Sequence, residues 1–263
     1  MRRTLYFLTS VGLAFAACGD SSPADANDAT ETVEAMTPKV TITPKEPGTD
    51  YPDAAITEWT YQGGAFSYGV DADTYELGEQ TPDANSTMCA NSGKGQHIHL
   101  IIDNEPYIAK YEANFEQEIA DGEHHILSFL SRSYHESIKT DAAHRAVKAN
   151  VADGAFASTE DITEPMLFYS RPKGTYVGKD AQSILLDFYP VNVDLGANAK
   201  VKVETGGETV TLDKWQPYII EGLPMGENTV TLSLVDGSGQ LIDAPLNPVS
   251  RTFTLKADPL MEK

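Results

Sequence analysis

Positive charge is scarce in this chain. Its 263 residues include 19 lysine and arginine residues against 39 aspartate and glutamate residues, which gives a formal net charge of −20 at pH 7. An acidic surface repels the phosphates of nucleic acids and the headgroups of anionic lipids. The composition therefore argues against nucleic acid as a partner and against membrane binding through a basic patch.

Long apolar runs are also lacking. The sequence holds no run of about 18 or more apolar residues, the length at which a transmembrane helix is expected. Hydrophobic residues nevertheless make up 41% of the chain, which is too many for a fully disordered protein. We therefore expect a folded protein, and the length allows one or two domains.

The amino-terminal residues are typical of an export signal. Met1-Arg2-Arg3 supplies a short positive region, residues 5–17 are mostly apolar, and small residues precede Cys18. Such a segment is too short, and wrongly flanked, to be a membrane-spanning helix. We predict a signal peptide over residues 1–17.

The end of this signal, Phe15-Ala16-Ala17-Cys18, resembles a bacterial lipobox with Phe15 in place of the usual leucine. The resemblance implies that Cys18 carries a lipid, becomes the first residue of the mature protein and anchors it to a membrane of the cell envelope. Ala14-Phe15-Ala16 also suits an ordinary signal peptidase, so simple secretion is the alternative. Gly19 is not the aspartate that retains some bacterial lipoproteins in the inner membrane, so we expect the outer membrane or the cell surface.

Residues 18–55 have few hydrophobic residues and many aspartates, threonines and prolines. Such a segment cannot bury enough apolar surface to offset the entropy lost on ordering. It is predicted to be a flexible acidic tether.

The rest of the chain contains an internal repeat. Residues 110–130 align with residues 214–234 at a constant offset of 104 without a gap, and both copies contain a lysine, an aromatic residue and a Gly-Glu turn before a strand. Self-similarity near one hundred residues matches the size of an immunoglobulin-like sandwich.

Local patterns agree with an all-β fold. Short segments rich in alternating or β-branched residues are separated by glycine-containing turns, at about the 8–12-residue spacing of a sandwich. We predict two tandem immunoglobulin-like β-sandwich domains after the signal peptide and the disordered tether. The first covers residues 56–152, a linker covers residues 153–165, and the second covers residues 166–263.

All six histidines lie between residues 97 and 144, in the first repeat. An offset of 103 aligns His97 and His99 with Lys200 and Lys202 and keeps the apolar neighbours of each pair on the core face. Two histidines on one strand face can converge on one ion, and imidazole suits copper, zinc or nickel. His135 is a candidate third ligand. The alternative is that these histidines are simply solvated or hydrogen-bonded.

Cys89 is the only cysteine besides Cys18, so it has no partner for an internal disulfide once Cys18 is lipidated or removed. It follows Met88, and soft sulfur with imidazole is a copper-compatible donor set. Cys89 is therefore a further candidate metal ligand, and the alternative is a buried thiol that acts as a small hydrophobe.

The histidine strand carries a resemblance. Gly95-Gln96-His97-Ile98-His99-Leu100-Ile101-Ile102-Asp103, followed by Asp121-Gly122-Glu123-His124, is similar to small exported bacterial domains whose strand has a His-x-His-Leu stretch. The whole chain resembles bacterial envelope lipoproteins with tandem sandwich domains, which are sometimes labelled phosphopeptide-binding. The resemblance implies a fold and a location, and it brings no established activity.

The sequence shows no signature of an enzyme. It has no G-x-S-x-G nucleophile turn and no Walker loop. Lys94 and Arg132, with Arg171, are candidates for an anion site if the fold brings them together. We therefore predict a non-enzymatic binding or scaffolding protein of the cell envelope, with copper or zinc as the candidate cofactor of the first domain. The alternative is an adhesion-type module that binds a protein, peptide, phosphopeptide or glycan partner without metal.

Overall fold

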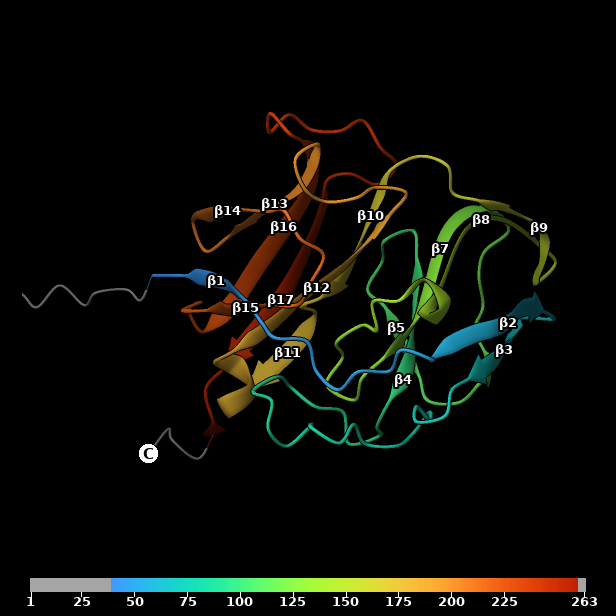
Figure 1. The fold of residues 1–263 in the computed structure, drawn as a ribbon, viewed down its shortest axis with the longest axis horizontal. Coiled ribbons are helices and arrows are strands. Elements are labelled where there is room, and N and C mark those ends of the chain that lie inside the picture. The colour runs from blue at the N-terminus through green and yellow to red at the C-terminus, as the bar shows by residue number, and fades with distance from the viewer. Residues whose placement is uncertain (1–38, 260–263) are drawn as a thin grey trace, which may run out of the picture. The chain divides into compact units, whose positions relative to one another are not determined.

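The computed structural model describes residues 39–259, whose regular structure is almost entirely β-strand (Figure 1). The exceptions are two short 3-10 helices, η1 (Asp141–Ala143) and η2 (Gly178–Ala181). The all-β prediction is confirmed. Nothing between residues 39 and 259 forms a helix long and apolar enough to cross a membrane. The predicted signal peptide and Cys18 lie outside the described residues.

The first sandwich consists of a three-stranded and a five-stranded sheet. The small sheet has the order β2 (Ala55–Gln62), β3 (Ala65–Asp71), β6 (Asn114–Glu116). The large sheet has the order β5 (Ile108–Lys110), β4 (His97–Ile102), β7 (Gly122–Ser131), β8 (His144–Ala152), β9 (Ala155–Asp161). Aromatic and aliphatic side chains from both sheets form its core, among them Phe66, Ile98 and Ile126.

The second sandwich has a four-stranded and a five-stranded sheet. The first of these has the order β1 (Thr41–Pro44), β15 (Tyr218–Glu221), β12 (Ile184–Val191), β10 (Met166–Arg171). The other has the order β11 (Gly174–Val177), β17 (Val249–Lys256), β16 (Gly226–Asp236), β13 (Ala199–Thr205), β14 (Glu208–Leu212). Its own apolar core lies between these sheets and includes Val201, Leu232 and Phe253.

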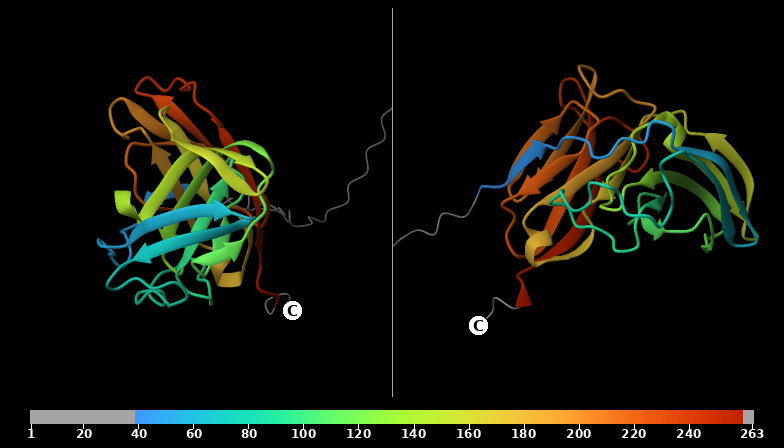
Figure 2. Two further views of the ribbon diagram at one scale, coloured as in Figure 1. Left: turned by 90° about the vertical axis from the view of Figure 1, so that its right-hand side faces the viewer. Right: turned by 60° about the horizontal axis from the view of Figure 1, so that its bottom comes forward.

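The boundary of the tether differs from the prediction. Residues 41–44 form β1, which pairs with β15 of the second sandwich, and the blue strand lies beside the orange strands in Figures 1 and 2. Val40 is buried in the core of the second sandwich and Tyr51 in the core of the first. The prediction that the tether runs to residue 55 was therefore wrong for residues 40–55, because a short polar strand is stabilised by a distant partner rather than by its own composition.

The predicted linker at residues 153–165 is also mostly ordered. Residues 155–161 form β9, which pairs with β8 at the edge of the large sheet of the first sandwich. Most β9 side chains are exposed, so this edge strand has the polar composition of a linker. The linker prediction was wrong for this segment.

A third apolar cluster joins the two sandwiches. It lies on the face of β4 and β7 that points away from the first core, and on β10 and β12 of the second sandwich. Its buried members are Ile101, Tyr107, Leu127, Phe129, Ile162, Met166, Phe168, Tyr189 and Val191. The outer face of the histidine strand is therefore covered by protein.

Candidate metal centre

Strand β4 carries two of the three clustered histidines. His97 lies opposite Ser131 of β7, and Lys200 of the second sandwich lies opposite Val235, which is 104 residues after Ser131. His97 and Lys200 are thus equivalent at an offset of 103, as the sequence predicts. Alternation along β4 then places His97 and His99 together on the face away from the first core.

The third histidine comes from the turn after β7. The backbone N–H of His135 donates to the carbonyl of Arg132 at 2.9 Å, and the N–H of Arg132 donates to the carbonyl of Glu136 at 2.9 Å. His135 has a φ of 69°, the left-handed conformation that such a tight reversal requires. The turn returns the side chain of His135 to the outer face of β4.

The three rings converge. Nε2 of His97 lies 2.9 Å from Nε2 of His99 and 2.9 Å from Nδ1 of His135. All three nitrogens lie within 4.8 Å of one another, and His97 and His99 are fully buried. Two ligands that each bind one ion at about 2.0–2.1 Å, at angles between 90° and 110°, are about 2.9–3.4 Å apart. The two contacts of His97 therefore have the spacing of ligands on a shared metal ion.

Hydrogen bonds outside the cluster assign the ring hydrogens. Nδ1 of His97 donates to the carbonyl oxygen of Gly95 at 2.8 Å, so the neutral ring has its lone pair on Nε2. The guanidinium of Arg171 donates two N–H groups to the hydroxyl oxygen of Tyr107, at 3.1 and 2.7 Å. With both N–H groups donated to this oxygen, the hydroxyl hydrogen of Tyr107 can donate to Nδ1 of His135, 3.2 Å away, in the tautomer that has its lone pair on Nδ1.

This assignment leaves two lone pairs facing each other. Nε2 of His97 and Nδ1 of His135 are 2.9 Å apart, and in these tautomers neither nitrogen has a hydrogen to donate to the other. Such a contact between neutral rings, one buried and one half-buried, is unfavourable unless a cation lies between them. The arrangement is what a metal ion requires, because imidazole binds metals through the unprotonated nitrogen.

The surroundings keep the rings neutral. Burial, together with the nearby positive charges of Arg171 and Lys173 and against the hydrogen bond to Gly95, lowers the pKa of His97 to about 4. Burial lowers the pKa of His99 and of His135 well below the ordinary value, again with help from the two cations. At neutral pH, three unprotonated imidazoles are therefore available as ligands.

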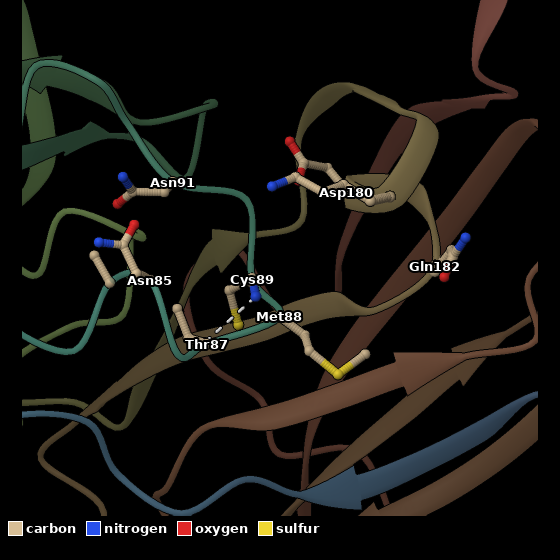
Figure 3. A pocket seen from close by; sticks show the side chains of 9 residues that line it. Asn85, Thr87, Met88, Cys89, Asn91, Asp180 and Gln182 are labelled. Carbon is tan, nitrogen blue, oxygen red and sulfur yellow. Dashed lines mark hydrogen bonds between the residues drawn. The ribbon is translucent and has the colours of Figure 1, made fainter. Parts of the chain in front are cut away.

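Cys89 does not join the histidines. It packs with Ala84, Tyr134 and Leu185, and its backbone N–H donates to Oγ1 of Thr87. Burial raises the pKa of its thiol. It lines a separate cavity of about 360 Å³ between residues 84–91 and residues 179–182 (Figure 3). The hypothesis that Cys89 completes the metal site was wrong.

The anion-site residues are also separated. Lys94 lies 5.3 Å above the ring of Tyr111, whereas Arg132 forms an ion pair with Glu136 at 3.2 Å and donates to the carbonyl of Thr49. Arg132 is therefore already paired with a carboxylate. Of the three predicted cations, Arg171 is the one that lies beside the histidines, through Tyr107.

Three neighbours of the site were missed by sequence reasoning. Tyr107 stacks on the ring of His99, Oγ of Ser170 lies 3.3 Å from Nδ1 of His99, and Nζ of Lys173 lies above the ring of Tyr107. Ser170 and Lys173 belong to the second sandwich. No local pattern marks them, because they reach the histidines only through the packing of the two sandwiches.

Comparison with known proteins gives weak likenesses. No family model and no curated protein matches the chain. Among solved structures, it is similar to the fibronectin(III)-like modules of Clostridium thermocellum CbhA, with 17% identity and a TM-score of 0.28 over 35% of this chain and 99% of that one. It is also similar to the chicken CNTN1 FN1–FN3 domains, with 12% identity and a TM-score of 0.22 over 82% of this chain and 65% of that one.

A third likeness is to a Ca²⁺-stabilized adhesin with which an Antarctic bacterium binds ice. Its identity is 13% and its TM-score 0.20, over 81% of this chain and 50% of that one. The chain thus spans about half of the adhesin and two thirds of the chicken chain. At such low TM-scores, nothing about function follows from these likenesses.

Proposed function

We propose that this protein is a non-enzymatic binding protein of the cell envelope whose first sandwich holds one transition-metal ion, copper or zinc, through His97, His99 and His135. The observation that carries the proposal is the convergence of the three rings, in which Nε2 of His97 lies 2.9 Å from Nε2 of His99 and 2.9 Å from Nδ1 of His135. Nitrogen ligands of this kind suit copper and zinc.

The location is proposed from the amino-terminal sequence. Cys18 would carry a lipid that anchors the protein to the outer membrane or the cell surface, and a polar segment separates it from β1. The acidic surface suits a protein exposed to water outside the cell. A protein, peptide or glycan is the proposed partner class, and nucleic acid is not.

Calorimetric titration with copper(II) and zinc(II), together with metal analysis of the purified protein, tests the metal proposal. We expect one ion per chain with a dissociation constant below about 10 μM. The double variant His97→Ala/His99→Ala should lose this binding, because it retains one of the three converging imidazoles.

The matched control is His144→Ala, which removes a half-buried histidine of the same sandwich that lies outside the cluster. It should bind metal as the parent does. If neither ion binds the parent, or if the double variant binds as tightly, the metal proposal is wrong. The protein would then be a metal-free module that recognises its partner through its loops.

A further inference from the structure

We infer that the phenolic oxygen of Tyr107 is the fourth ligand of the metal ion and the only anionic one. The inference rests on the proposed function, since it assigns a further ligand to the same ion. The histidine cluster contains no carboxylate or thiolate within ligand distance among residues 39–259. A dication held by three neutral rings would therefore lack any negative ligand from the described chain.

The position of the hydroxyl group fits a ligand. Tyr107 is buried, and its ring stacks on His99 with 3.7 Å between centroids and 6° between planes. Its oxygen lies 3.2 Å from Nδ1 of His135, within the separation of about 2.9–3.4 Å that two ligands of one ion adopt. The stacked ring leaves the hydroxyl group little freedom to point elsewhere.

Burial raises the pKa of Tyr107 to about 12, and the positive charge of Arg171 acts in the opposite direction and favours an anion at this oxygen. Arg171 is buried and donates two N–H groups to the oxygen, and Nζ of Lys173 lies 3.9 Å from the centroid of the ring. Neither cation has a carboxylate within 4.0 Å among residues 39–259. A buried guanidinium without a negative partner is costly, and a phenolate at Tyr107 supplies that partner.

Metal binding itself removes the present acceptor of Tyr107. In the tautomer that can bind a metal through Nδ1, the phenol of Tyr107 donates to the lone pair of His135 Nδ1, which is the lone pair that the metal takes. A buried O–H group without an acceptor is unfavourable. In the proposed step the O–H bond breaks, its electron pair stays on oxygen and binds the metal, and the proton leaves to solvent. No change of oxidation state is involved.

Copper(II) provides a direct readout on the full protein. A coordinated phenolate gives a charge-transfer band in the visible region and phenolate vibrations in the resonance Raman spectrum, and imidazole ligands give neither. We expect both signals from the parent protein loaded with one copper(II) ion. Tyr107→Phe keeps the stacked ring and removes the oxygen, so it should lose both signals and bind copper at least about tenfold more weakly.

Two neighbouring tyrosines are matched controls. Tyr111 packs its ring 4.9 Å from that of His97, but its hydroxyl group bonds to Ser92. The hydroxyl group of Tyr176 accepts an N–H from Arg171 at 2.8 Å, as that of Tyr107 does. Tyr111→Phe and Tyr176→Phe should both keep the phenolate signals.

The outcomes separate this inference from the proposed function. If the parent binds one copper(II) ion without phenolate signals, or if Tyr107→Phe keeps them, Tyr107 is not a ligand while the histidine site stands. If the parent binds no metal, the proposed function fails and the inference fails with it. A copper(II)-loaded parent without phenolate signals overturns the inference whether or not Tyr107→Phe folds.

Discussion

His124 of the first sandwich and Asn228 of the second occupy equivalent positions and make one bond in common. Nε2 of His124 lies 2.9 Å from the carbonyl oxygen of Ala120, and Nδ2 of Asn228 donates to the carbonyl oxygen of Pro224 at 2.8 Å. Each side chain therefore bonds the start of its strand to the backbone carbonyl of the residue four positions earlier. His124 has an additional contact, since its Nδ1 lies 2.6 Å from a carboxylate oxygen of Asp103.

This contact predicts a pH-dependent stability. Burial lowers the pKa of His124, but its hydrogen bonds to Asp103 and Ala120 and the charge of Asp103 raise it above the ordinary value of 6.5 overall. A pKa raised by folding stabilises the protein fully below the unfolded value and no longer does so once the pH exceeds the folded value. His124→Asn, which the second sandwich tolerates, should therefore cost about 0.5–1 kcal/mol near pH 5.5 and less near pH 9.

Urea unfolding of both proteins at the two pH values measures this difference. The parent should be the more stable protein at the lower pH, and the gap should narrow at the higher one. If the difference in free energy of unfolding between the two proteins is equal at both pH values, the charged form of His124 contributes nothing to stability.

The sequence predicts part of the histidine cluster at this scale. The period of two along β4 and the register of the repeat correctly place His97 and His99 on one face, and His135 was correctly named as their companion. Their burial was not predictable, because the residues that cover them come from the second sandwich. Tyr107 and Arg171 are 64 positions apart, and no local pattern connects them.

At the scale of elements, β1 completes a sheet of the second sandwich although it precedes the whole first sandwich in the chain. Two glycines of the second sandwich leave space for the residues just before β1. A Cβ atom at Gly222 would lie 2.6 Å from the carbonyl oxygen of Lys39, and one at Gly206 would lie 2.5 Å from Cγ2 of Val40. The second sandwich is thus shaped to receive the segment that leads into β1.

Gly222→Ala should displace this segment. Gly222 and Gly207 both have a φ of 80°, so alanine at either costs about 1–2 kcal/mol of backbone strain. At Gly207 nothing lies within 4 Å of the new Cβ atom, whereas at Gly222 it meets backbone. We therefore expect Gly222→Ala to be the more destabilising, by about 1–3 kcal/mol.

Hydrogen exchange locates the effect. The amides of residues 41–43 should lose protection in Gly222→Ala and keep it in the matched control Gly207→Ala. Equal stability and equal protection in the two variants would mean that the close approach to Lys39 does not hold β1 in place.

The two strands that lie in the predicted tether and linker are edge strands. β1 lies at the edge of its sheet, and β9 lies at the edge of the large sheet of the first sandwich. Edge strands bury little apolar surface, and polar side chains on them limit aggregation. Their composition is therefore that of a tether or a linker. The central strands β4, β7, β13 and β16 were predictable, because they carry the alternating core residues of the repeat.

At the scale of the whole described unit, the two sandwiches are joined by polar contacts as well as by the shared cluster. The side chain of Asn104 donates to the carbonyl of Leu167 at 2.8 Å and accepts from the N–H of Tyr169 at 2.8 Å, as a neighbouring strand would. Nζ of Lys139 pairs with the fully buried carboxylate of Asp187 at 2.6 Å. If either sandwich unfolds, polar groups of the other lose their hydrogen-bond or ion-pair partners.

The two sandwiches should therefore unfold together, and metal binding should stabilise both. The histidines belong to the first sandwich, but Ser170 and Arg171 of the second surround them, so the intact site needs both. A ligand present at about 100 times its dissociation constant stabilises the folded state by about 2.7 kcal/mol. For a unit of this size, that corresponds to an increase in Tm of roughly 5–10 °C.

Scanning calorimetry with and without zinc measures this coupling. The parent should show one transition, and zinc should move all of it, while His97→Ala/His99→Ala should show one transition that zinc leaves in place. If the parent shows two transitions and zinc moves only one, the sandwiches fold independently. In that case the second sandwich would not contribute to the affinity for zinc, because zinc binding would not stabilise it.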